Sequence, residues 1–88
     1  MVQFALYERN LDSKHIYYTC SVNSENNIEK VIKKHKDKSD GELYVIPIND
    51  GDGITHKFSN KEQIDNRWNK TNGLSDDLKT TLDSVLNN

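Results

Sequence analysis

The sequence predicts a small α+β domain with an antiparallel sheet of about four strands, in ββαββαα order, and with helices packed on one face. Three observations lead to this fold class. Two segments near the N-terminus alternate apolar and polar residues, a helical pattern and two further strand-like segments follow, and two helical patterns end the chain. The length of 88 residues suits a single domain, which we place over residues 1–88.

The composition favours a folded chain with a thin core. Leu, Ile, Val and Phe make up about 24% of the residues, above the roughly 20% below which chains tend to stay unfolded, and the formal net charge is −2. Charged residues reach 30%, so little apolar surface is available for burial. We therefore expect a partner or a second copy to add stability, which favours a homodimer.

Residues 2–7 and 15–22 predict a hairpin of two half-buried strands. In the first segment, VQFALY, Phe4 and Leu6 point to one face and Tyr7 points to the other. In the second segment, HIYYTCSV, four residues are expected to share the apolar face: Ile16, Tyr18, Cys20 and Val22. The polar link between the two segments suits a turn.

The first helix is expected to begin near Asn26 or Asn27. The sequence Asn26-Asn27-Ile28-Glu29 is close to a capping box, in which Asn26 accepts a hydrogen bond from a free backbone N–H. The apolar stripe that follows has the spacing of one helical face and consists of Ile28, Val31, Ile32 and His35. The run Ser39-Asp40-Gly41 should end the helix.

Two strands are expected after this helix. Residues 43–48, LYVIPI, suit a strand that is covered on both faces, which favours a central position. Pro47 favours the sheet edge instead, because proline donates no hydrogen bond to a neighbouring strand. Residues 49–53 predict a turn, and residues 54–58 predict a short strand whose Ile54, His56 and Phe58 share a face.

Two helices complete the predicted fold. Ser59 and Glu62 form a capping box that opens the first of them, which is only weakly amphipathic because Ile64 and Trp68 alone make its stripe. Ser75 is expected to cap the last helix, and two aspartates follow it where the helix dipole favours negative charge. The last helix has a strong apolar side, made of Leu74, Leu78, Leu82, Val85 and Leu86.

The stretch KVIKKHKDK, residues 30–38, holds five lysines. On a helical wheel, Lys30, Lys33 and Lys34 fall opposite the apolar stripe. We interpret them first as a solvated helix face and second as candidate phosphate contacts, because lysine meets phosphate as a point charge. No RNA-recognition signature, zinc-finger spacing or glycine clamp accompanies them.

Aromatic residues provide the second candidate surface. If the helices cover the apolar face of the hairpin, Tyr7 and Tyr17 lie on the exposed face, and Tyr44 joins them in one register. Exposed tyrosines anchor protein interfaces or stack bases, although tyrosines also pack across strands for stability alone. Trp68 is the single tryptophan, and we expect it to be a core anchor first and an interface residue second.

The sequence offers no clear catalytic or metal-binding constellation. Cys20 is the single cysteine, and its parity places it on the apolar face, away from His15, where a cysteine is usually inert. His35 and His56 are the other histidines, and no C-x-x-C or H-x-x-x-H spacing occurs. Counted as a calcium loop from Asp50, the sequence lacks the required glycine and glutamate. We therefore expect no metal, no cofactor and no enzymatic activity.

Together these patterns favour a non-catalytic cytoplasmic domain that binds another protein. The start of the chain lacks the pattern of a signal peptide, and no apolar run is long enough to cross a membrane. The candidate interface residues are Tyr7, Tyr17, Tyr44 and Trp68. The alternative is a nucleic-acid-associated module that contacts phosphates through the lysine-rich first helix.

Overall fold

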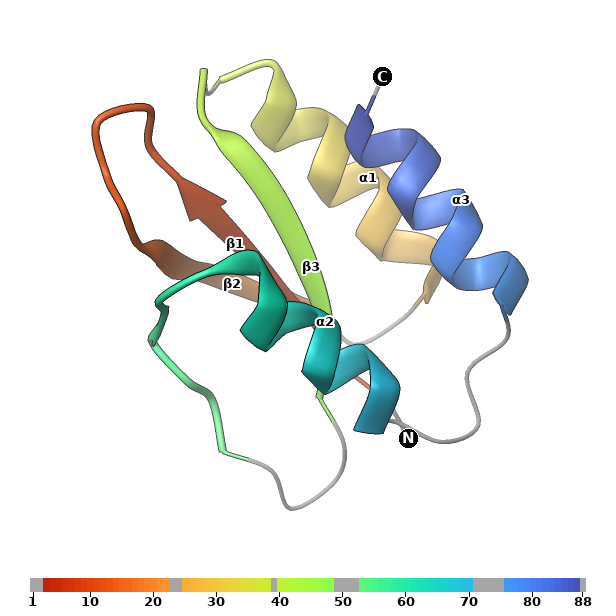
Figure 1. The fold of residues 1–88 in the computed structure, drawn as a ribbon. Coiled ribbons are helices and arrows are strands. Elements are labelled where there is room, and N and C mark those ends of the chain that lie inside the picture. The colour runs from red at the N-terminus through yellow and green to blue at the C-terminus, as the bar shows by residue number, and fades with distance from the viewer. Residues whose placement is uncertain (1–2, 23–24, 39, 49–52, 71–75, 88) are drawn as a thin grey trace.

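The computed structural model describes residues 3–22, 25–38, 40–48, 53–70 and 76–87 and has the predicted ββαββαα order (Figure 1). One antiparallel sheet contains β1 (Gln3–Arg9), β2 (Ile16–Val22), β3 (Glu42–Ile48) and β4 (Lys57–Phe58). Its spatial order is β3-β1-β2-β4. The helices are α1 (Glu25–Lys36), α2 (Lys61–Lys70) and α3 (Asp76–Asn87).

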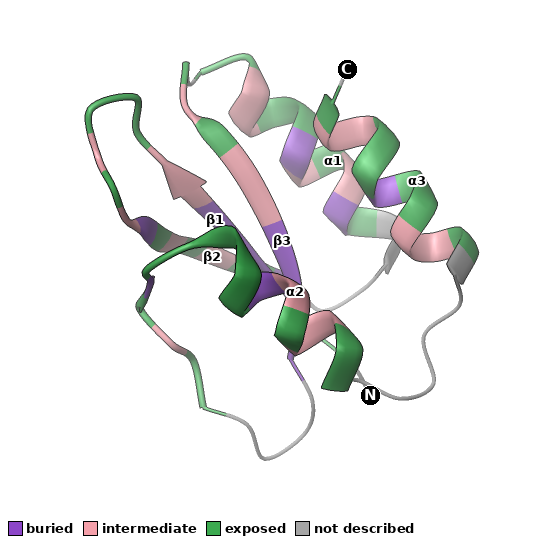
Figure 2. Cartoon of the chain, in the orientation of Figure 1, coloured by how far each residue is buried: buried purple, intermediate pink, exposed green. Residues whose placement is uncertain are grey.

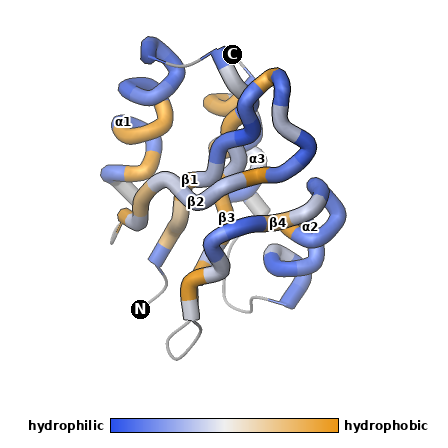
Figure 3. Tube along the Cα trace, turned by 90° about the vertical axis from the view of Figure 1, so that its left-hand side faces the viewer, coloured by the Kyte–Doolittle hydropathy of each residue, from blue (hydrophilic) through white to orange (hydrophobic). Residues whose placement is uncertain are grey.

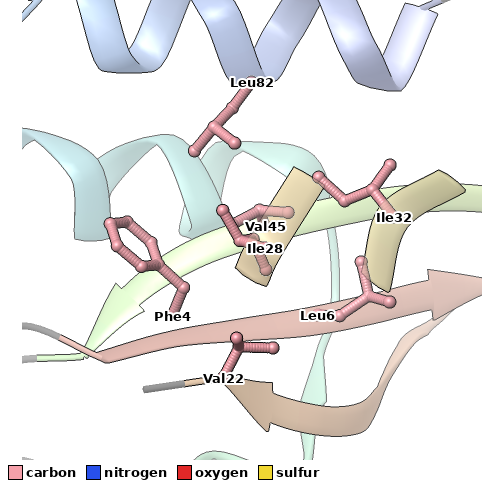
Figure 4. Close-up of a cluster of buried hydrophobic side chains, with 7 residues drawn as sticks. All are labelled: Phe4, Leu6, Val22, Ile28, Ile32, Val45 and Leu82. Carbon is pink, nitrogen blue, oxygen red and sulfur yellow. The ribbon is translucent and has the colours of Figure 1, made fainter. Parts of the chain in front are cut away.

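The central strand β1 is buried on both faces and divides the core into two clusters. Phe4 and Leu6 point to the first face, where α1 and α3 cover them (Figures 1 and 4). The buried members of this first cluster are Phe4, Leu6, Val22, Ile28, Ile32, Val45 and Leu82. Figure 2 shows that buried residues are concentrated in β1, β3 and α1. The apolar stripe predicted for the first helix therefore faces the sheet, as expected.

The second face of β1 carries Ala5 and Tyr7, and it is also covered. The buried members of this second cluster are Ala5, Tyr7, Ile16, Ile46, Ile48, Phe58 and Ile64. The last of these belongs to α2. Two helices thus pack on the first face as expected, whereas α2 lies beside β3 and contributes to the opposite cluster.

A β-bulge in β2 changes which face its residues occupy. Leu6 pairs with Cys20, but the next residue of β1, Tyr7, pairs with Tyr18, so Thr19 is an extra residue in β2. Cys20 therefore packs with the first cluster, together with Val22, whereas Tyr18 packs with the second, together with Ile16. The expectation that these four residues share one face is wrong, because the extra residue reverses the alternation.

Strand β3 lies at the edge of the sheet, as Pro47 indicated, and not at its centre. Residues 45–48 are nevertheless all buried, because helices flank this edge on both faces. Successive residues of an antiparallel edge strand point their peptide groups alternately inward and outward. The Val45 carbonyl accepts a hydrogen bond from outside the sheet, from Trp68 of α2. Leu43 and Pro47 lie two residues before and after Val45, so their peptide groups also point away from the sheet. Pro47 has no N–H, so it leaves no unpaired donor at this edge.

Several predicted boundaries shift in the structure. Helix α1 begins at Glu25, one residue before Asn26, and ends at Lys36. Of residues 54–58 only Lys57–Phe58 form a strand, and Ile54 is exposed instead of sharing a buried face. The predicted turn at residues 49–52 and the cap at Ser75 lie outside the described residues.

The cap of α2 lies one residue later than the sequence pattern indicated. The backbone N–H of Gln63 donates to Asn60 Oδ1 at 3.1 Å, so Asn60 is the N-cap. The Gln63 side chain reaches back and accepts from the Ser59 N–H at 2.8 Å. The Ser59 and Glu62 capping box is therefore wrong, because Asn60 and Gln63 have the same three-residue spacing and equivalent donor and acceptor groups.

Candidate functional site

A groove follows the outer edge of β3, between the two helices that flank this strand. It consists of two hollows of about 390 and about 400 Å³, which share Tyr44, Lys61 and Leu86 and therefore lie side by side. The hollow toward the start of β3 is also lined by Lys36, Gly41, Glu42, Leu43 and Asn87. The other is also lined by Val45, Ile64, Asp65, Trp68, Asn69, Lys79 and Asp83. Hollows of this size fall within the range of sites that bind ligands.

Trp68 forms one wall of the groove and also anchors α2 to the sheet. Its Nε1–H donates to the Val45 carbonyl oxygen at 2.8 Å, and its ring lies 6.4 Å from that of Phe4, measured between centroids. The residue packs against both core clusters and remains partly exposed. The two expected roles, core anchor and surface aromatic residue, are thus compatible at this position. The bond also satisfies one carbonyl of the sheet edge, which limits unwanted pairing with other strands.

Tyr44 forms part of the groove floor and is held by a polar cluster on two neighbouring strands. Its hydroxyl donates to Glu42 Oε2 at 2.5 Å, and Arg9 Nη2 contacts Glu42 Oε1 at 2.5 Å. These bonds, first from Tyr44 and then from Arg9, lower the pKa of Glu42. Partial burial, followed by the bond to Glu42, raises the pKa of Tyr44. The tyrosine therefore stays neutral near pH 7 with its ring fixed in place.

The rim of the groove carries both signs of charge. Lys61 and Asp65 stand on α2, and Lys79 and Asp83 stand on α3. The Lys79 ammonium group lies 5.8 Å from the centroid of the Trp68 ring, within the range of a cation–π contact. Partly exposed aromatic rings with charges of both signs around them suit a protein segment better than a phosphate, which requires an excess of positive charge.

Of the four aromatic residues predicted as an interface, the groove brings together only Tyr44 and Trp68. Tyr7 is fully buried, so its predicted exposure is wrong. Its hydroxyl donates to the Thr55 carbonyl oxygen at 2.5 Å, and burial raises its pKa to about 12. Tyr17 is 46% exposed as predicted, but it lies on β2, on the far side of β1 from the groove.

The lysine-rich face of α1 lies in solvent, as its helical spacing indicated. Lys30, Lys33 and Lys34 are all exposed, while Ile28 and Ile32 are buried against the sheet. This exposure agrees both with a solvated helix face and with phosphate contact. Exposure alone therefore supports the two interpretations equally.

Lys36 differs from the other lysines of α1, and sequence reasoning missed its role. Its Nζ donates to the carbonyl oxygens of Val85 and Leu86, at 2.9 and 3.2 Å. These carbonyls belong to the last turn of α3, where a cation also complements the helix dipole. The lysine thus links the ends of α1 and α3 beside the groove. No spacing in the sequence could indicate this contact, because the residues lie 49 and 50 positions apart.

The single cysteine has one histidine neighbour. Cys20 Sγ lies 3.9 Å from His35 Nε2, while His15, which precedes β2, packs edge-on against Tyr17. Burial raises the pKa of Cys20, which keeps the thiol protonated and weakly nucleophilic near pH 7. Among the described residues, no group of three or more His, Cys, Asp or Glu side chains could hold a metal ion.

Comparisons with known proteins do not assign the chain to a class. It matches no protein-family model, and no curated protein or solved structure is significantly similar to it. Within the described segments, none of the helices combines the length and apolar character that a bilayer crossing requires. The groove and the charged surfaces are therefore the features from which a function can be inferred.

Proposed function

We propose that this protein is a small non-catalytic binding module that takes up an extended segment of a partner protein along β3. The observation that carries the proposal is the groove of two adjacent hollows between α2 and α3, with Tyr44 and Trp68 in its lining. Aromatic side chains that are held in place and partly exposed provide large contact areas at low entropic cost. We place the module in the cytoplasm, since its single cysteine indicates no disulfide framework.

The sheet edge supports an extended segment as the occupant. A strand-like peptide that lies along β3 can pair with outward peptide groups, such as those of Leu43, while its side chains enter the two hollows. Pairing cannot continue through Val45, because its carbonyl already accepts from Trp68. The bound segment is therefore expected to be short. It should carry an apolar anchor beside Trp68, positive charges that complement Asp65 and Asp83, and negative charges that complement Lys61 and Lys79 at the rim.

Selection from a displayed library of short random peptides tests this proposal. Enriched peptides should share an apolar anchor, and NMR titration with isotope-labelled protein should shift the amide signals of Tyr44, Lys61 and Leu86. The double variant Asp65→Lys and Asp83→Lys should bind them less tightly, by about tenfold, if each rim contact contributes about 0.7 kcal/mol.

The matched control is Tyr17→Ala, which removes an exposed aromatic residue far from the groove and should leave peptide binding unchanged. Failure to enrich any peptide, or shifts centred on Tyr17, would contradict the proposal. If the enriched site instead mediates contact between two copies of the chain, sedimentation would show a concentration-dependent dimer that the rim variant disrupts.

A nucleic-acid-associated role is the second candidate, and the exposure of Lys30, Lys33 and Lys34 on one face of α1 favours it. Titration of labelled DNA and RNA, followed by anisotropy at two salt concentrations, tests it directly. Phosphate contact predicts affinity that falls steeply with salt, because counterions are released on binding. The triple Lys→Glu variant should then lose binding and keep its melting temperature. Binding that survives in this variant would exclude this face.

A further inference from the structure

A basic pocket lies on the side of α2 that faces away from the groove. It has a volume of about 390 Å³ and lies between α2 and the β4 segment, which run beside each other (Figure 3). Its lining consists of Thr55, Lys57, Phe58, Ser59, Gln63, Asn66, Arg67 and Lys70. At 100° per residue, the helical members project from the opposite side of α2 to the groove residues. The pocket is thus a separate surface from the proposed protein-binding site.

The charge of this pocket distinguishes it from the rest of the molecule. Lys57, Arg67 and Lys70 are cationic, and no carboxylate occurs among its described lining residues, although the whole chain has a formal net charge of −2. The groove, by contrast, has both signs on its rim. Cations gathered in a concave surface raise the local concentration of anions.

Arg67 is held in this pocket by contacts that include a hydrogen bond and a cation–π contact. Its Nη2 donates to Thr55 Oγ1 at 3.0 Å, and its guanidinium carbon lies 5.9 Å from the centroid of the Phe58 ring. One contact fixes an edge of the planar group and the other fixes its face. A preoriented guanidinium loses less entropy when it binds an anion, and its geometry matches phosphate oxygens.

The remaining side chains suit a multiply charged oxyanion. Lys57 and Lys70 are exposed and flexible, so their ammonium groups can adjust to an anion beside Arg67. Asn66 and Ser59 add hydrogen-bonding groups at the same opening. Three cations match the dianionic charge of a phosphate monoester better than the single charge of a carboxylate.

We propose that the pocket between β4 and α2 binds the phosphate group of a small phosphomonoester through Lys57, Arg67 and Lys70. The site is independent of the groove and of the lysines of α1. We assign a small molecule as its ligand, since a hollow of about 390 Å³ suits a ligand of that size.

NMR titration of the isotope-labelled protein with inorganic phosphate, at constant ionic strength maintained with sodium chloride, tests this site. Saturable shifts should occur at Lys57, Asn66 and the Arg67 side chain. The double variant Lys57→Gln and Lys70→Gln should bind phosphate at least tenfold more weakly. Both substitutions are on exposed residues and keep a polar side chain, so the melting temperature should not change.

The matched control replaces the same number of exposed lysines outside every proposed site, as Lys14→Gln and Lys38→Gln, and should keep the wild-type phosphate affinity. Equal losses in both double variants would overturn the proposal, because they would show a general charge effect. Shifts that grow linearly without saturation would overturn it as well. Preference for a single-stranded oligonucleotide over phosphate, lost in both double variants, would replace it with a nucleic-acid surface.

Discussion

Replacing Tyr7 with phenylalanine should change stability in opposite directions at neutral and at high pH. The Tyr7 hydroxyl is buried and donates to the Thr55 carbonyl oxygen. At about pH 8, Tyr7→Phe loses this bond, and the free energy of unfolding should fall by about 1 kcal/mol. The fold should persist, because the ring that packs edge-on against Phe58 is retained.

The sign reverses at high pH because burial raises the pKa of Tyr7 from 10.0 to about 12. A raised pKa in the folded state means that the native protein favours the neutral phenol, so this contribution is complete below pH 10 and is lost as pH rises toward 12. The loss amounts to about 1.4 kcal/mol at pH 11 and approaches about 3 kcal/mol above pH 12. Wild type and Tyr7→Phe should therefore be about equally stable near pH 11, and the variant should be the more stable above it.

Urea unfolding followed by far-UV circular dichroism, at several pH values between about 8 and about 12, measures this crossing. The difference between wild type and variant isolates Tyr7, since every other ionisable group is present in both proteins. Tyr17→Phe, at an exposed tyrosine, is the control and should show no crossing. If the stability difference between wild type and Tyr7→Phe stays constant over this range, the hydroxyl is not buried. Tyr7 would then be a surface residue.

Three further predictions concern single contacts and are measured by urea or thermal unfolding. Trp68→Phe removes the donor to a β3 carbonyl and should lower the free energy of unfolding by about 1–2 kcal/mol. An unchanged free energy of unfolding would show that water can replace the indole as the donor. Asn60→Ala should cost about 1 kcal/mol and Ser59→Ala almost nothing, and the reverse order would place the cap at Ser59. Gly41→Ala places a Cβ 2.7 Å from the Arg9 carbonyl oxygen and should cost about 1–3 kcal/mol, whereas an unchanged melting temperature would show that the backbone yields freely.

The order of elements was predictable from the sequence because each element carries its own period. Phe4 and Leu6 alternate on a strand, and Ile28 and Ile32 repeat on a helix, and all four are buried in one cluster. Such local patterns depend only on the direction in which successive side chains point. They do not depend on how the rest of the chain packs.

The faces of β2 were not predictable in the same way. Its sequence alternates without interruption from Ile16 to Val22, and no glycine or proline indicates the extra residue at Thr19. A bulge depends on the partner strand and its register, which a single segment does not contain. Parity did place Tyr7 opposite Leu6 correctly, but it could not show that other elements cover that second face.

The groove and the basic pocket depend on tertiary placement, so the sequence indicated only parts of them. Trp68 stood out as the single tryptophan on a sparse helix, but its contact with the β3 edge joins residues 23 positions apart. Lys57 lies on a different element from Arg67 and Lys70, and nothing in their spacing predicts one pocket. The lysine stretch of α1, by contrast, could be found from the sequence because its charges are adjacent along the chain.

The weak amphipathicity of α2 follows from its position at a sheet edge. A helix on the face of a sheet needs a full apolar stripe, whereas α2 is anchored by Ile64 and by Trp68, whose indole also bonds the backbone of β3. Most of its surface is therefore available to polar side chains on two sides, with Asp65 toward the groove and Arg67 and Lys70 toward the basic pocket. A weakly amphipathic sequence is thus the pattern expected of a helix that lies between two polar surfaces. The two proposed sites can change independently, because they share this helix but none of its lining residues.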